Sequence, residues 1–164
     1  MMEKCIEEIS DKILMEIKQI NIVQAEKQHF AKMIEVANEQ LGIDYVDKST
    51  LENLAASPEK VANVAVDEKE NVLGFSFGSL ITAADLTKQL KIPREKVKLV
   101  AGTADKVGVF KTIAVKKECT KLGIGSRLAK DLITQMRDYA QVICSVAWKT
   151  PVGINIEKSY KKIN

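Results

Sequence analysis

The spacing of hydrophobic positions predicts helices in the first third of the chain. Near the N-terminus, isoleucines recur every three or four residues with Glu and Lys between them, at Ile6, Ile9, Ile13, Ile17 and Ile20. This predicts one amphipathic helix, which the β-branched piece INIV at 20–23 interrupts. A second helical set, which Gly42 closes, comprises Phe30, Met33, Ile34, Ala37 and Leu41. Ser49 and Glu52 form a capping box that predicts a short third helix, ended by Pro58.

The middle of the chain changes to a pattern typical of strands. The runs VANVAV at 61–66 and VLGFSFG at 72–78 lie on either side of the polar turn DEKEN, which predicts a β-hairpin. Thr82 is expected to cap a helix that continues through Leu90 and stops at Pro93. A lysine-rich connection without a predicted element follows.

The last third of the chain predicts a strand, a helix and a second strand. VGVFKTIAV at 107–115 is expected to be a long, largely buried strand, and QVICSVAW at 141–148 another one. One helical face between them carries Leu128, Leu132, Met136 and Ala140. Residues 107–148 therefore form a βαβ-like unit, which favours the mixed α/β class. The final INIEKSYKKIN is expected to be helical.

Composition indicates a single soluble domain and excludes several function classes. The chain has 164 residues, 46% of them hydrophobic and 29% charged, and a net charge of +3. Its lysines alternate with glutamates, which argues against a nucleic-acid surface. No apolar run has membrane-spanning length and no signal peptide is evident, so a cytoplasmic protein is expected.

Cysteine and histidine usage argues against metal and disulfide chemistry. Cys5, Cys119 and Cys144 are odd in number and widely separated, which indicates a reducing compartment and neither disulfides nor a zinc site. His29 is the only histidine and lies far from any cysteine in the sequence, so a Cys/His nucleophile is not expected. No bound metal is predicted.

The stretch VKKECTKLGIGSRLAKDL at 115–132 carries the candidate chemistry. Two glycines, Gly123 and Gly125, lie where a strand gives way to a helix. A helix N-terminus has unpaired N–H groups and a partial positive charge, so it binds anions, and cations flank this one at Lys116, Lys117, Lys121 and Arg127. The pattern suits a phosphate ester. The alternative is a tight turn that only packs the helix on the strand.

Two common nucleotide motifs do not fit this stretch. A P-loop needs Gly-Lys-Ser/Thr, whereas Ser126 follows Gly125 here. A dinucleotide fingerprint needs a third glycine where Leu128 stands. The segment IAVKKECTKLGIGSRLAKDLI instead resembles the coenzyme-A-binding motif of the GNAT superfamily of acyl-CoA-dependent N-acetyltransferases. That motif is a central strand, a Gln/Arg-x-x-Gly-x-Gly/Ala loop and a helix. Thr120 stands where the family has Gln or Arg.

The resemblance extends to the order of elements over residues 20–164. INIVQAEKQHFAKMIEVANEQLG is similar to the family's first strand and helix, the hairpin lies where its second and third strands belong, and SYKKIN resembles its last helix. The implied fold is a GNAT-like mixed, mostly antiparallel sheet flanked by helices. Residues 1–19 would be a helical extension outside this single domain. The family usually continues into closing strands, so two alternatives are expected. Either the C-terminal end is truncated, or the sheet is completed differently, by a partner molecule that pairs with the edge at 141–148, as in a homodimer.

The resemblance assigns roles to individual residues. Acetyl-CoA would be the acyl-donor cosubstrate, and its pantetheine arm would pair with the backbone of Ile113, Ala114 and Val115. The pyrophosphate would lie on the loop amides, with Arg127 reaching a phosphate; the loop residues are Lys121, Leu122, Gly123, Ile124, Gly125 and Ser126. Asn155 would lie near the coenzyme tail, and Tyr160 would protonate the departing thiolate. The implied reaction is direct attack of an amine on the thioester.

Three functions remain as alternatives. The first is an N-acetyltransferase that acts on a primary amine of a small molecule or peptide. The second is a non-catalytic acyl-CoA-binding or regulatory domain of the same fold, which Thr120 and the lack of a carboxylate on strand 107–115 favour. The third is a partner-binding module that docks through its N-terminal helix. Asp44, Tyr45 and Asp47 lie in the connection where the family often binds its acceptor, which indicates a cationic amine.

Overall fold

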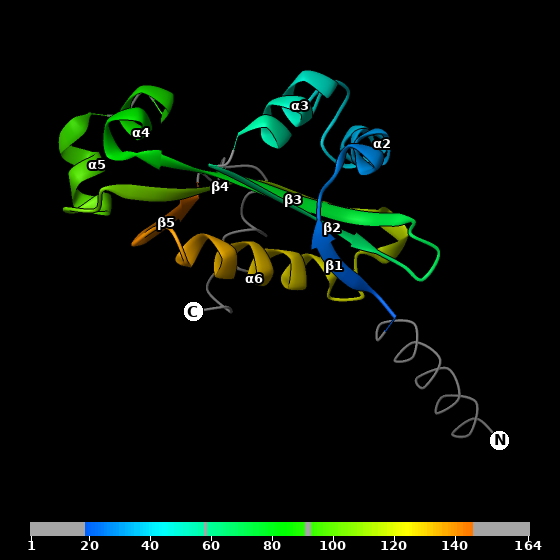
Figure 1. Cartoon of the computed structure of the whole chain (residues 1–164). Helices are drawn as coiled ribbons and strands as arrows, with labels where there is room; N and C mark the ends of the chain where they lie inside the picture. Colours follow the sequence, from blue (N-terminus) through cyan, green and yellow to red (C-terminus); the bar gives the residue numbers. More distant parts are fainter. Residues whose placement is uncertain (1–18, 58, 91–92, 146–164) are drawn as a thin grey trace.

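A five-stranded sheet forms the centre of the computed structural model, which describes residues 19–57, 59–90 and 93–145 (Figure 1). The strands lie in chain order, as β1 (Asn21–Gln24), β2 (Lys60–Val66), β3 (Val72–Thr82), β4 (Lys106–Val115) and β5 (Val142–Ser145). Neighbouring strands from β1 to β4 are antiparallel, whereas β4 and β5 are parallel. The predicted hairpin and the predicted βαβ-like unit are both confirmed.

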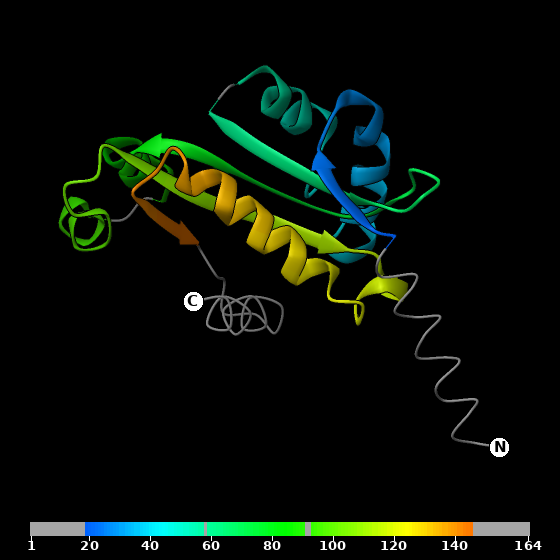
Figure 2. The same ribbon diagram turned by 60° about the horizontal axis from the view of Figure 1, so that its bottom comes forward.

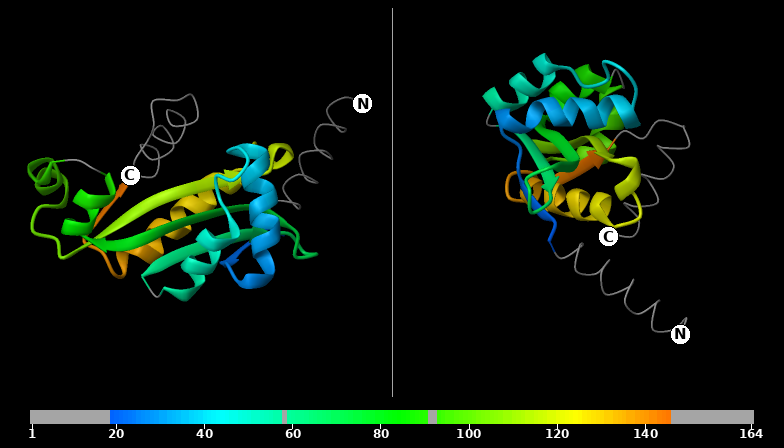
Figure 3. Two further views of the ribbon diagram at one scale, coloured as in Figure 1. Left: turned by 90° about the horizontal axis from the view of Figure 1, so that it is seen from above. Right: turned by 90° about the vertical axis from the view of Figure 1, so that its right-hand side faces the viewer.

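Helices cover both faces of this sheet. One face carries α2 (Phe30–Gln40) and α3 (Lys48–Ala56), and the opposite face carries α6 (Ile124–Arg137) (Figures 1 and 3). Helix α6 lies lengthwise along the sheet (Figure 2). Two shorter helices, α4 (Ala83–Leu90) and α5 (Arg94–Ala101), lie at the end where β3 stops and β4 starts. The 3₁₀ turns are η1 (Lys27–His29) and η2 (Lys117–Cys119). The mixed α/β class is therefore confirmed.

The core consists of two apolar layers that the sheet separates. Met33, Leu51 and Phe75 are each 0% exposed between the sheet and helices α2 and α3. Leu128 and the other predicted residues of the α6 face are buried against the opposite side. Each large side chain buried in this way contributes roughly 1.5–3 kcal/mol through removal of apolar surface from water.

A glycine on β3 allows α6 to approach the sheet closely. A Cβ atom at Gly78 would overlap the Met136 side chain of α6 and lie 2.5 Å from the Val109 carbonyl oxygen. Any larger residue at this position would push the helix and strand apart. Gly78 therefore sets the separation between α6 and the centre of the sheet.

The structure corrects the start of the third helix. The sequence pattern predicted a Ser49 cap, but Asp47 is the N-cap, and its Oδ1 accepts a hydrogen bond of 2.7 Å from the Thr50 amide. Ser49 lies in the first turn, where its Oγ donates to Asp47 Oδ1 at 3.0 Å. A carboxylate is the stronger acceptor and interacts better with the positive end of the helix dipole.

The predicted connection after Pro93 is also wrong, because it contains helix α5. Val97 and Ala101 lie one turn apart on this helix and are 1% and 2% exposed. They pack with Leu86 of α4 and with Val107 and Val109 of β4. The signal was two apolar residues among many charged ones, too weak to be recognised before the neighbouring elements were known.

Several predictions concern residues outside the described ranges. These are the N-terminal amphipathic helix at 1–18, the end of the last predicted strand at 146–148 and the C-terminal helix. The described part of that strand, β5, is half-buried to exposed and not fully buried as predicted. Within the described ranges, no helix is both long and apolar enough to cross a membrane.

Candidate functional site

Strand β4 contains a bulge at Lys111, which the sequence analysis did not anticipate. Phe77 of β3 lies opposite Thr112, but the next residue, Gly78, lies opposite Phe110, so Lys111 is one extra residue on β4. A bulge leaves its extra residue out of the ladder and bends the strand locally. Such bulges often lie beside active sites, where they redirect backbone groups.

Beyond this bulge, one edge of β4 has no described strand beside it. The parallel partner β5 pairs only with the segment from Val107 to Phe110. The Lys116 amide bonds the Leu73 carbonyl of β3 at 2.8 Å. Because backbone groups alternate in direction along an antiparallel strand, Ile113 and Val115 turn their N–H and C=O groups away from β3. Ala114 turns its own toward β3. The residues at 113 and 115 thus offer a hydrogen-bonding edge to an extended ligand.

The loop after β4 ends in a set of amides without acceptors. Helix α6 begins after the N-cap Gly123, and no side chain caps it. In the part of the chain that the structure describes, the amides of residues 123–126 donate to no backbone or side-chain acceptor. The first-turn N–H groups and the helix dipole form a site for an anion. No described residue therefore caps the loop amides.

The two loop glycines have different structural causes. Gly123 has a φ of 72°, in the left-handed region that favours glycine, so the turn itself requires it. A Cβ at Gly125 would meet only Val115 at 3.6 Å and Ile113 at 3.9 Å, which are ordinary contact distances. Alanine would fit there and would favour the helix by up to ~1 kcal/mol. Packing of helix on strand therefore does not explain Gly125, whereas close approach of a ligand to the backbone does.

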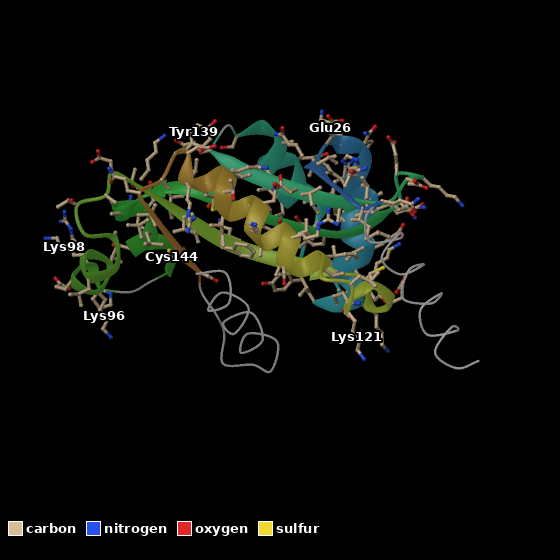
Figure 4. All side chains as sticks on the ribbon, turned by 90° about the horizontal axis from the view of Figure 1, so that it is seen from below. Glu26, Lys96, Lys98, Lys121, Tyr139 and Cys144 are labelled. Carbon is tan, nitrogen blue, oxygen red and sulfur yellow. The ribbon has the colours of Figure 1, made fainter. Side chains whose placement is uncertain are left out.

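Positive charge surrounds these amides. None of Lys116, Lys117 and Lys121 forms an ion pair with the described residues. The Lys121 side chain projects outward from the loop before α6 (Figure 4). Arg127 differs, because its Nη2 donates to the Ile20 carbonyl at 2.6 Å and so holds the start of β1 against α6. The loop lysines are therefore the cations free to meet a phosphate.

The remaining residues of the loop have structural partners. Thr120 Oγ1 donates to the Lys117 carbonyl at 2.9 Å, inside its own turn. Burial, and then the charge of Glu118, raises the pKa of the Cys119 thiol, so this buried cysteine stays protonated at neutral pH. Leu122 packs against the apolar cluster under the N-terminus of α6. These contacts hold the loop in shape without using its free amides.

His29 and the acidic connection after α2 form local structural hydrogen bonds. His29 Nδ1 accepts a 3.0 Å hydrogen bond from the Glu26 amide, so the only histidine caps η1. The Asp47 carboxylate caps α3, and Thr50 is the main cause of its lowered pKa. The Asp44 amide donates to Asn38 Oδ1 at 3.3 Å, while Tyr45 is 52% exposed. No cluster of three or more His, Cys, Asp or Glu among the described residues could hold a metal ion.

The structure brings two of the predicted groups together, and the third lies outside the described residues. The loop at 121–126 and the β4 segment at 113–115 meet at one end of the sheet, since a Cβ at Gly125 would contact Ile113 and Val115. Tyr160 and Asn155 lie outside the described residues. The sequence analysis did not single out Lys111, because the bulge that distinguishes it depends on strand register, which has no local signature.

Solved structures with the same architecture include both enzymes and a regulator. No protein-family model matches the chain, and no curated protein matches its sequence. The aminoglycoside N-acetyltransferase AAC(6')-Iy in complex with CoA is 11% identical, with a TM-score of 0.63 over 88% of this chain and 86% of that one. The aminoglycoside 6'-N-acetyltransferase AAC(6')-Ih from Acinetobacter baumannii is 13% identical, with a TM-score of 0.62 over 88% and 89%.

The regulator shows that this architecture does not fix one function. It is a transcriptional regulator from Bacillus halodurans C-125, 15% identical, with a TM-score of 0.66 over 88% of this chain and 91% of that one. At such low identities the likeness concerns the fold. These similarities establish that the chain, with its five-stranded mixed sheet, has the GNAT fold of these N-acetyltransferases.

Proposed function

We propose that the chain is an N-acetyltransferase that transfers an acetyl group from acetyl-CoA to a primary amine. The observation that carries this proposal is one juxtaposition. Among the described residues, the amides at 123–126 have no acceptor, and they lie beside the β4 edge at Ile113 and Val115, which has no partner strand there. A diphosphate and an amide-containing arm in one ligand would satisfy both sets of groups.

The residues present fit acetyl-CoA as a cosubstrate. Its thioester supplies an activated acyl carbon to the amine. The amides of Gly123 to Ser126, with Lys121 nearby, would hold the pyrophosphate, and the backbone of residues 113–115 would orient the pantetheine arm. The bulge at Lys111 frees backbone groups from the ladder, so an N–H in this segment could donate to a developing oxyanion.

Proton transfer completes the proposed reaction. The described part of β4 has no carboxylate, so the amine would attack the thioester in its neutral form and lose its proton to water. Tyr160 is proposed to give a proton to the departing thiolate, because a phenol is a competent acid toward sulfur. Most of the catalysis would then come from positioning the two reactants.

The second candidate is a non-catalytic acyl-CoA-binding domain of the same fold. Thr120 supports it, because its hydroxyl bonds its own turn where the family has a longer Gln or Arg side chain. A neighbour of similar fold is a transcriptional regulator, which shows that proteins with this architecture include regulators. Turnover separates the two candidates: an enzyme releases CoA from acetyl-CoA in the presence of an amine, whereas a binding domain only retains the ligand.

The proposal is tested by titration of acetyl-CoA against three proteins. Gly125→Trp places a large ring over the amides, and we expect its Kd to rise about a hundredfold, equivalent to ~2.7 kcal/mol. Thr134→Trp carries the same ring on the exposed side of the same helix, and we expect wild-type affinity. Thermal melting checks that both variants fold. Equal affinity of Gly125→Trp and wild type would refute the proposed cofactor site.

A further inference from the structure

Ser79 of β3 is a buried polar group that the proposed cofactor site does not use. It is 3% exposed, and its Oγ has no hydrogen-bond partner among the described residues. A buried hydroxyl without a partner is destabilising by roughly 1–3 kcal/mol. Such a group therefore needs an explanation, and a ligand that completes its hydrogen bonding is one.

The strand register shows where the Ser79 side chain lies. Ser79 is directly opposite Lys60 of β2, and cross-strand neighbours share a face of the sheet. Phe77 and Ile81, two positions away in each direction, pack in the clusters beneath α2–α3 and α4–α5. Ser79 thus faces the side of the sheet that carries α3 and α4, beside the cross-strand residue Lys60.

A hollow opens at this place because the two strands differ in extent. β2 begins at Lys60, whereas β3 runs on to Thr82 and into α4. The hollow has a volume of about 260 Å³, below the range of roughly 300–1,000 Å³ typical of sites for drug-sized ligands. Its polar lining consists mainly of Glu59, Lys60, Ser79, Asp85, Lys106 and Lys111. It therefore suits a small polar group.

The charges of this lining favour an anion. Lys60, Lys106 and Lys111 form no ion pair with the described residues, although Lys60 Nζ donates to the Asn53 carbonyl at 3.3 Å. Asp85 accepts from Thr82 Oγ1 at 2.7 Å and lies 3.9 Å from Lys88 Nζ. Glu59 is the remaining carboxylate of the lining. Burial, followed by the charge of Lys60, lowers the pKa of Lys111. The three lysines outnumber the two carboxylates of the lining.

We propose that this hollow binds a carboxylate of the amine acceptor, so that the acceptor is an amino acid. Ser79 Oγ and the ammonium groups of Lys60 and Lys111 would donate to the carboxylate oxygens. Lys111 is also the bulge residue from which the open β4 edge starts, so a bound carboxylate would leave the amine near the proposed thioester position. The inference rests on the proposed function. Polycationic amines would be repelled by the three lysines.

The first test compares acceptors that differ only in the carboxylate. We expect kcat/KM for an α-amino acid to exceed that for its carboxamide by at least about tenfold, as for loss of one charge-assisted hydrogen bond. Lys111→Met and Ser79→Ala should each reduce this ratio toward one. Lys96→Met, which removes an exposed lysine of α5 that does not line the hollow, should leave the ratio unchanged. An equal or inverted preference in the wild type would overturn the assignment.

The second test measures binding without turnover and separates the two proposals. The protein is titrated by calorimetry with an N-acetyl amino acid, with its carboxamide and, separately, with CoA. Binding of the carboxylate form alone, lost in Ser79→Ala while CoA affinity is retained, supports the inference. Binding of CoA with no carboxylate preference overturns the inference and leaves the proposed function intact. Carboxylate binding without CoA binding refutes the proposed function and identifies the hollow as an anion site of another kind.

Discussion

Ser76 and Ser79 lie three residues apart on β3, so their side chains face opposite sides of the sheet. Ser76 is 0% exposed, and its Oγ donates to the Leu128 carbonyl of α6 at 3.4 Å. Ser79 is 3% exposed and has no partner among the described residues. One strand therefore carries a satisfied hydroxyl under α6 and an unsatisfied hydroxyl in the hollow between α3 and α4.

The side of the sheet under α6 satisfies its other buried polar side chain as well. Asn63 is 0% exposed, and its Nδ2 donates to Asp131 Oδ2 of α6 at 2.8 Å. Gln135 Nε2 donates to the same carboxylate oxygen at 2.9 Å and to Asn63 Oδ1 at 3.3 Å. These bonds join β2 to α6 and set their relative position. The buried polar groups under α6 thus form hydrogen bonds that stabilise the fold, whereas the Ser79 hydroxyl, without a described partner, is available to a ligand.

The largest expected effect on stability comes from removing the hydrogen bonds between β2 and α6. Asp131→Ala would leave the Asn63 and Gln135 amide groups without their shared acceptor, and we expect a loss of ~2 kcal/mol in the free energy of unfolding. Lys130→Ala, an exposed change one position away, should alter stability by less than ~0.5 kcal/mol. Urea unfolding midpoints measure both. Similar midpoints for the two variants would show that the Asn63–Asp131–Gln135 contacts do not stabilise the fold.

Alanine substitutions of the two serines are expected to change the free energy of unfolding by smaller amounts and in opposite directions. Ser79→Ala removes an unpartnered buried hydroxyl and should raise the free energy of unfolding by ~1 kcal/mol. Ser76→Ala removes a bonded hydroxyl and should lower it by ~0.5–1 kcal/mol. Thermal and urea unfolding report the sign. A destabilised Ser79→Ala would mean that its hydroxyl already has a partner, which contradicts the explanation of the hollow as a ligand site.

The smallest effect concerns a satisfied polar group at the surface, the Asp47 cap. Its hydrogen bonds with Thr50 lower the pKa of Asp47, so its stabilisation is present above the unfolded-state pKa of about 4 and is lost as the pH falls through the lower folded-state value. Asp47→Ala should therefore reduce the melting temperature at pH 7 and have less effect near pH 2. The cap in Asp47→Asn does not titrate, so the difference in melting temperature between Asp47→Asn and Asp47→Ala should be the same at pH 7 and pH 2. If the wild type and Asp47→Asn showed the same pH dependence of melting temperature, titration of Asp47 would not explain the effect.

Hydrophobic periodicity predicted the elements that bury a continuous apolar face. The α6 face with Leu128, Leu132 and Met136 and the long β4 strand were both predictable, because each shows its period over many residues. Helix α5 was not, since only Val97 and Ala101 mark its buried side. The Asp47 cap was missed because Ser49 and Glu52 match a capping box equally well in sequence.

The loop before α6 could be predicted from the sequence, whereas the hollow at Ser79 could not. Gly123 and Gly125 predicted the loop, because a turn followed directly by a helical pattern can be recognised in the local sequence. Lys60, Ser79 and Lys111 come from three strands and carry no shared motif. Their proximity follows from the β2–β3 register and from one extra residue on β4.

The amino-acid sequence by itself determined the class of fold, the succession of strand, helix and strand in the C-terminal third and the position of the loop that precedes α6. Local period and glycine placement encode these features within a single segment. Only the tertiary structure decided that, within the described ranges, the first amides of α6 have no cap, Gly125 makes no close packing contact and the Ser79 hydroxyl has no partner. Each of these depends on which atoms of distant segments meet, and that is settled by register and packing, not by the order of residues in one segment.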